Sequence, residues 1–157
     1  MKCGVVVILV LVLTTALVLG APQRHAAPAH LPERIDVFYD DSVSLTSLEA
    51  VKQTLAGRAT INLYDMNAPE RIEDELGHGL PPDVEQSKRI IMERMQAIGI
   101  EQLKQRFVAA YQGVLYAQKY GIDRYPAIVF DDGASVVYGV ADLQEALNRY
   151  REWSRQR

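Results

Sequence analysis

The pattern of apolar and polar residues after position 33 predicts a strand, a helix and a second strand. Residues 34–40 (RIDVFYD) place apolar side chains at alternate positions and are rich in β-branched and aromatic residues, as strands are. In residues 45–55 leucine and valine recur at helical spacing, and residues 60–65 (TINLYD) have the composition of a second strand. About twenty residues separate the two strands, which predicts a βαβ unit with parallel strands.

Both ends of the predicted helix carry end signals. Thr46 and Glu49 have the spacing of a capping box, in which each side chain binds a backbone N–H group of the first turn. Gly57 predicts the end of the helix, because glycine adopts the left-handed conformation that closes many helices.

The middle of the chain is predicted to be helical. A short acidic helix over 69–76 is followed by the loop 77–82 (GHGLPP) and by two longer helices, which end at Gly99 and Gly121. Each longer helix has an apolar stripe, which we expect to face a core. The stripes are Val84, Ile91, Met95 and Ile98 in the first, and Ile100, Leu103, Phe107, Ala110, Val114 and Ala117 in the second.

The last part of the domain predicts a hairpin and a closing helix. Residues 126–130 (PAIVF) form a short apolar strand, and residues 135–138 (SVVY) form the returning strand. Between them, 131–133 (Asp-Asp-Gly) favours a tight turn, because these residues tolerate a positive φ. A helix is expected over 141–153.

The first twenty residues differ from the rest. Lys2 precedes an apolar run over 5–19, which predicts a secretory signal peptide at 1–20, cleaved after Gly20. The alternative is an uncleaved membrane anchor, although the run is slightly short for about 30 Å of hydrocarbon. Either way the rest of the chain is expected outside the cytoplasm, with no stable membrane insertion if the signal is cleaved. Residues 21–33 are rich in proline and alanine and predict a flexible leader.

Composition excludes two classes of function. Cys3 is the only cysteine and would be lost with the signal, and thiol–disulfide exchange requires a thiolate, so the mature chain would be redox-inactive. Removing residues 1–20 takes away Lys2 alone, which leaves 16 basic residues against 20 acidic ones. This acidic balance argues against a general nucleic-acid binder, and no nucleic-acid partner is expected.

The sequence carries no pattern typical of an enzyme. It has no nucleophile–base motif, phosphate loop or cluster with metal-ligand spacing. The pair Asp131-Asp132 belongs to the predicted turn, and Asp40-Asp41 to a helix-start region that favours acids. We therefore expect no catalytic residue, no metal and no cofactor.

Residues 117–147 (AQKYGIDRYPAIVFDDGASVVYGVADLQEAL) resemble the C-terminal half of the thioredoxin fold. The residues that carry the resemblance, in order, are Tyr120-Gly121-Ile122, Pro126, Asp132-Gly133 and Gly139. With the βαβ front, the resemblance covers 34–153 and implies an α/β, thioredoxin-like domain with a helical insertion at about 66–99. It also implies a cis Tyr125–Pro126 bond, whereas the residues alone allow a trans proline at the start of a strand.

Redox members of the thioredoxin family carry Cys-x-x-Cys just after the first strand, where this chain has DDSVSL at 40–45. The resemblance implies a groove beside the cis proline, in which redox relatives hold an extended peptide. Such a groove can accept a partner's strand by edge pairing. The residues expected to line it are Asp40, Asp41, Ser42, Tyr125 and Pro126. The residues leave open whether these side chains bind a partner or only shape the loop, and the helical insertion is a competing contact surface.

The whole chain also resembles small exported proteins of bacterial integrating conjugative elements, in its signal, its YPAIVFDDG segment and its VVYGV-x-DL ending. The resemblance implies a non-catalytic periplasmic accessory or assembly protein of a conjugative transfer (type IV secretion-like) apparatus. Its partners would be other proteins of that apparatus. The alternative is an exported enzyme or small-ligand-binding protein on the same redox-inactive scaffold.

Overall fold

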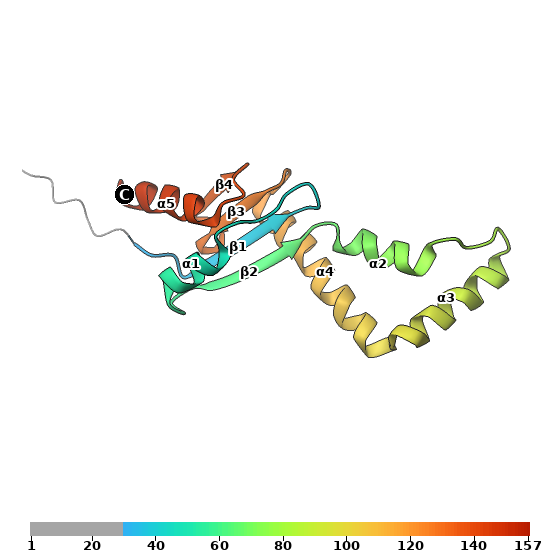
Figure 1. Cartoon of the computed structure of the whole chain (residues 1–157). Coiled ribbons are helices and arrows are strands. Elements are labelled where there is room, and N and C mark those ends of the chain that lie inside the picture. The colour runs from blue at the N-terminus through green and yellow to red at the C-terminus, as the bar shows by residue number, and fades with distance from the viewer. Residues whose placement is uncertain (1–29) are drawn as a thin grey trace, which may run out of the picture.

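A computed structural model describes residues 30–157, so the predicted signal peptide and most of the predicted leader lie outside the described residues. A four-stranded mixed sheet confirms the α/β prediction (Figure 1). The strands are β1 (Arg34–Tyr39), β2 (Thr60–Asp65), β3 (Ala127–Phe130) and β4 (Ser135–Tyr138), in the spatial order β2-β1-β3-β4. The pair β1/β2 is parallel, as predicted, whereas β3 is antiparallel to both β1 and β4.

Helices cover both faces of the sheet. Side chains of a strand point alternately to its two faces, and here apolar side chains on both faces are buried under helices. On one face, α1 (Leu48–Leu55) and α5 (Leu143–Ser154) bury the main core. On the other, the C-terminal part of α4 (Ile100–Tyr120) packs on Phe38 and Tyr64. Gly113 permits this close approach, since a Cβ atom there would lie 3.1 Å from the Cβ of Tyr64. The main core consists of Ile35, Val37, Val51, Leu55, Ile128, Phe130, Val140, Leu143, Ala146, Leu147 and Tyr150.

The inserted helices project away from the sheet (Figure 1). This helical arm consists of α2 (Ala68–Gly77), α3 (Val84–Ile98) and the N-terminal part of α4. Its own core contains three buried residues, Ile72, Leu103 and Ala110. The expectation that the α3 stripe faces a core is confirmed in part: Ile91, Met95 and Ile98 are half-buried, and Met95 and Ile98 pack against the core of the arm rather than against the sheet. Val84 is 64% exposed, and Met95 and Ile98 are only partly buried.

The helix ends agree in part with the predictions. The prediction of a capping box at Thr46 and Glu49 is wrong. The helix α1 begins after Ser47, whose φ is 60°, and the Thr46 hydroxyl donates a hydrogen bond to Asp142 instead. The first helix ends at Leu55 and is capped by Ala56 in the left-handed conformation, one residue before Gly57. The predicted end of α4 at Gly121 is confirmed. None of the helices formed by residues 30–157 is long and apolar enough to cross a membrane.

Candidate functional site

The groove residues predicted from the sequence meet at one end of the sheet. Strands β1 and β3 are antiparallel neighbours with Phe38 opposite Ala127, so the turn after β1 lies beside the residues that precede β3. The Tyr125–Pro126 bond in that segment is cis, as the resemblance implies. Burial raises the pKa of the Tyr125 hydroxyl, and the negative charge of nearby Asp40 raises it further. Tyr125 and Asp40 therefore lie near each other at this end of the sheet.

The turn at residues 40–42 is shaped by its own side chains. The Oδ1 atom of Asp40 accepts hydrogen bonds from the Ser42 N–H at 3.1 Å and the Ser42 hydroxyl at 2.5 Å. The backbone closes the same turn, because the Val43 N–H donates to the Asp40 carbonyl at 3.2 Å. Asp40 thus orders the turn, and it occupies the hydroxyl of Ser42 in doing so.

Asp41 is held from the helical arm. Its N–H donates to Oδ1 of Asn67 at 2.8 Å, and its carboxylate accepts from Nη1 of Arg71 at 2.7 Å. Arg71 also pairs with Asp65 at the end of β2. The start of α2 therefore clamps the groove turn against the sheet, a link that no local pattern in the sequence indicates.

At this end of the sheet the turn at 40–42 carries polar side chains, and the segment before β3 carries an aromatic ring and a proline. Pro126 is buried and Tyr125 half-buried, while Asp41 and Ser42 are exposed. Carboxylate oxygens accept hydrogen bonds from backbone N–H groups, and a tyrosine ring covers apolar surface. No cysteine follows Cys3 in the chain, so this end of the sheet carries no thiol to attack a disulfide.

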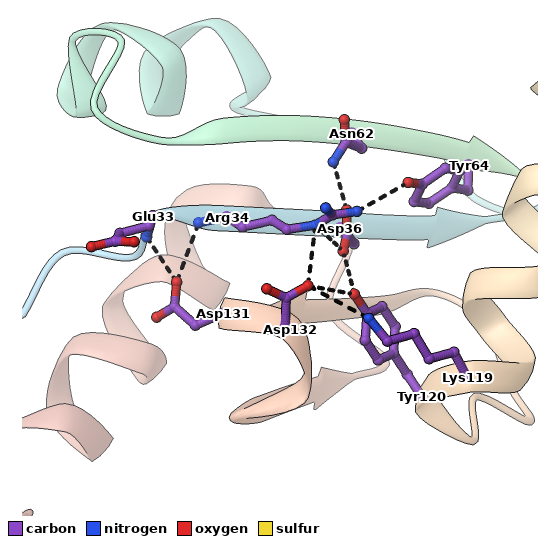
Figure 2. A network of polar contacts seen from close by, with 9 residues as sticks. All are labelled: Glu33, Arg34, Asp36, Asn62, Tyr64, Lys119, Tyr120, Asp131 and Asp132. Atoms are coloured by element: carbon purple, nitrogen blue, oxygen red, sulfur yellow. Dashed lines mark hydrogen bonds and ion pairs between the residues drawn. The ribbon is translucent and has the colours of Figure 1, made fainter.

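A second polar cluster, which the sequence reasoning missed, surrounds Asp36 in the middle of β1 (Figure 2). Asp36 is fully buried, and its carboxylate accepts hydrogen bonds from Arg34 Nε at 2.7 Å, Asn62 Nδ2 at 2.7 Å and the Tyr120 hydroxyl at 3.0 Å. The exposed Asp132 lies 3.1 Å from the Tyr120 hydroxyl and 3.7 Å from Arg34 Nε. An acid at an inward position of an otherwise apolar strand is the one sequence signal for this cluster.

The buried polar groups of this cluster are hydrogen-bonded to one another, which leaves none of them free to react. Burial raises the pKa of Tyr120, and its hydrogen bond to Asp36 raises it further, so the hydroxyl stays a donor at neutral pH. The hydrogen bond with Asp36 is the largest cause that raises the pKa of Arg34, which keeps the guanidinium charged. Every buried side-chain nitrogen or oxygen in the described residues has a hydrogen-bond partner. The geometry therefore assigns the Asp36 cluster a structural role, tying β1 to β2 and α4.

Comparison with known proteins gives a match to a protein family. Residues 43–156 match a family described as "Protein of unknown function (DUF1525)". The matched region begins directly after the groove turn and includes Tyr125 and Pro126. No curated protein and no solved structure matches the chain significantly.

Proposed function

The chain belongs to the DUF1525 family, and we propose that it is a non-catalytic, exported accessory protein of a conjugative transfer apparatus, which binds partner proteins in a thioredoxin-like groove. The observation that carries the proposal is that the Tyr125–Pro126 segment lies beside the turn at 40–42, at one end of the sheet. The two segments are more than eighty residues apart in the sequence, yet the antiparallel pairing of β1 with β3 brings them to the same end of the sheet.

The topology supports a thioredoxin-like fold for residues 34–153. The order β2-β1-β3-β4, with one parallel pair followed by two antiparallel pairs, agrees with a βαβ front joined to a hairpin. The helices α1 and α5 on one face and α4 on the other agree with the resemblance as well. The segment 66–99 then stands as an insertion, which contributes α2 and α3.

Binding rather than catalysis is supported by the chemistry of the groove. The carboxylates of Asp40 and Asp41 are engaged in ordering and clamping the turn. Tyr125 keeps a partly exposed ring, and its hydroxyl is neutral and can donate, because burial and Asp40 raise its pKa. A groove with ordered walls and no nucleophile is suited to holding a peptide without changing it.

The location and the partner class follow from the resemblance to exported proteins of integrating conjugative elements. On this proposal the signal at 1–20 directs the chain to the periplasm, where the groove binds another protein of the transfer apparatus. The binding energy would come from a short extended segment of that partner, paired through its backbone and packed on Tyr125.

Site-specific photo-crosslinking tests the proposal in cells that carry the whole conjugative element. A photoreactive amino acid replaces Tyr125 in one strain and the exposed Asn148 of α5 in the control strain. We expect position 125 to crosslink to a component of the transfer channel or pilus, and position 148 not to do so. If neither position captures such a component, or both capture it equally, the groove is not the binding site.

A binding variant separates function from folding. Tyr125→Ala removes the aromatic wall, and we expect weaker capture by that component together with lower conjugation frequency. Tyr125 is half-buried and packs against the core cluster that contains Phe38 and Tyr64, so the purified variant should melt at a lower temperature than the wild type but remain folded at the growth temperature. Normal transfer by the stably folded variant would contradict the proposed function.

A further inference from the structure

The end of the sheet opposite the groove brings together the start of β1 and the C-terminal ends of two helices. The loop after α1 reaches this end, because the Thr60 N–H donates to the Glu33 carbonyl just before β1. The C-terminal half of α5 reaches it as well, since the Tyr150 hydroxyl and the Glu33 N–H both donate to the Asp131 carboxylate. The groove turn follows the last residue of β1 and lies at the other end (Figure 1).

Arginines gather at this end, although the chain as a whole is acidic. The chain has 17 basic and 20 acidic residues, whereas residues 149–157 hold four arginines and one acid, Glu152. Arg149 pairs with Glu145 within α5. Four arginines of this end form no ion pair within residues 30–157 and define an arginine-rich end: Arg58, Arg151, Arg155 and Arg157.

Neither the helices nor neighbouring acids account for this charge. The macrodipole of a helix acts within its last turn, whereas Arg58 lies three residues beyond α1 and Arg157 three residues beyond α5. The exposed acids at this end are Glu33, Asp132 and Glu152. Asp132 is itself neutralised by two basic side chains. The four arginines therefore exceed the two remaining acids, which leaves a positive surface.

Trp153 supplies an aromatic surface beside these arginines. Its ring is partly buried against the main core, with the Tyr150 ring at 5.6 Å, and the Arg157 guanidinium lies 4.5 Å from its centroid. Tryptophan is enriched where lipid meets water, because its ring is apolar and its N–H remains hydrated. Arginine donates paired hydrogen bonds to phosphate oxygens. The combination is complementary to anionic phospholipid headgroups.

The course of the chain favours a membrane over a soluble acidic partner. The first described residues, 30–33, enter the domain at the arginine-rich end, about ten residues after the predicted signal or anchor at 1–20. Ten extended residues reach at most about 36 Å. During export, or permanently if the run at 5–19 stays uncleaved, this end of the domain is therefore the one held close to the bilayer.

We propose that the arginine-rich end binds the surface of a membrane that contains anionic phospholipid, with its guanidinium groups on the phosphates and Trp153 at the level of the headgroups. The contact is largely electrostatic, so it needs no inserted segment. The groove, at the opposite end of the sheet, faces away from the bilayer and stays accessible to a partner. This membrane contact is independent of what the groove binds.

Vesicle binding tests the proposal on the predicted mature chain, residues 21–157, which contains every described element. Trp153 is the only tryptophan, so its fluorescence reports on this end alone. With vesicles of phosphatidylglycerol and phosphatidylcholine in equal parts, we expect co-sedimentation and a shift of the emission to shorter wavelength, both weakened by salt. Vesicles of phosphatidylcholine alone should give neither.

Two results would overturn the proposal at this stage. One is no binding to the anionic vesicles, or equal binding to the neutral ones. The other is binding to polyglutamate as tight as to the anionic vesicles, which would assign this end to an acidic protein instead of a membrane.

Paired charge removals locate the site. Arg155→Gln combined with Arg157→Gln should lower the partition coefficient for anionic vesicles by about tenfold or more. The control, Lys88→Gln with Arg89→Gln, removes the same charge from α3 in the arm and should bind as the wild type does. Circular dichroism should be unchanged in both, since all four side chains are exposed. Equal weakening by the two pairs would show that net charge alone matters and would overturn the proposal. None of these results bears on the groove, because the assay contains no partner protein.

Discussion

Asp36 and Tyr120 are 84 residues apart in the sequence, yet the Tyr120 hydroxyl donates a hydrogen bond of 3.0 Å to the buried Asp36 carboxylate. The bond joins the middle of β1 to the last turn of α4. Arg34 and Asn62 bind the same carboxylate, so a single acid connects two strands and a helix (Figure 2). A buried carboxylate is tolerated because all three donors surround it.

Asp36→Asn should therefore destabilise the fold. An amide keeps one accepting oxygen but turns a donor toward the remaining N–H or O–H groups, so at least one buried partner loses its bond. We expect the free energy of unfolding, measured in urea, to fall by about 2–4 kcal/mol. The matched control is Asp132→Asn, in the same cluster but 61% exposed, with an expected change below about 1 kcal/mol. Asparagine also tolerates the φ of 55° at position 132. Equal losses in the two variants would contradict the assigned role of Asp36.

Alkaline pH should destabilise the protein through Tyr150. Its hydroxyl donates to Oδ2 of Asp131 at 2.5 Å, and burial together with this carboxylate raises its pKa. A tyrosine whose pKa is raised by folding contributes stability that is complete below its unfolded pKa of about 10. That stability is lost as the pH rises toward the folded value.

We expect the melting temperature of the wild type to fall above about pH 10, and to fall less steeply in Tyr150→Phe. Tyr138→Phe, on the edge strand β4, serves as the control and should follow the wild type. Parallel pH curves for Tyr150→Phe and the wild type would show that another group causes the alkaline loss.

Local sequence patterns were sufficient to predict the strands of the sheet and the hairpin. The period of β1 and β2, and the Asp-Gly turn between β3 and β4, depend on neighbouring residues alone. The helical period of α3 was also read correctly, but a period indicates which side of a helix is apolar and not whether anything covers it. In the arm no sheet lies beneath α3, so Met95 and Ile98 pack only on the small core of the arm, while Val84 stays exposed.

Contacts between distant segments explain the other differences. Thr46 and Glu49 have capping-box spacing, yet the Thr46 hydroxyl lies 3.1 Å from a carboxylate oxygen of Asp142, 96 residues away. The Asp36 cluster and the Arg71 clamp likewise join residues that no local window contains. The groove residues were identified through the resemblance, and their clamp was visible only in three dimensions.

Low pH should destabilise the N-terminus of α5, because it protonates the Asp142 carboxylate that caps this helix. Its carboxylate accepts from the Glu145 N–H at 2.9 Å and from the Ser47 hydroxyl at 2.8 Å, and these bonds lower its pKa. A carboxyl group whose pKa is lowered by folding contributes stability that is present above its unfolded pKa of about 3.9 and lost below it. Asp142→Asn keeps a good N-cap but removes the charge.

We expect Asp142→Asn to flatten the loss of melting temperature between about pH 5 and pH 2, while remaining folded at pH 7. Asp142→Ala loses the cap as well and should be less stable than Asp142→Asn at both ends of this range. Glu49→Gln, an exposed change on α1, is the control. If the melting temperature of Asp142→Asn falls at low pH as steeply as that of the wild type, other carboxyl groups cause the loss of stability in acid.

The clamp between the arm and the groove turn predicts a local effect on dynamics. Arg71 contacts both Asp41 and Asp65 from α2. Because Arg71 and Asp41 are exposed, Arg71→Ala should change the free energy of unfolding by less than about 1 kcal/mol. The turn at 40–42 would nevertheless lose a fixed partner, so its amides should exchange hydrogen faster, measured by mass spectrometry of peptides covering residues 40–46.

The control is Arg106→Ala, which breaks a pair with Glu75 within the arm and should leave exchange in those peptides unchanged. If both variants speed exchange there equally, the arm stabilises the turn only through its general folding. If neither does, the Asn67 bond to the Asp41 N–H is sufficient to hold the turn.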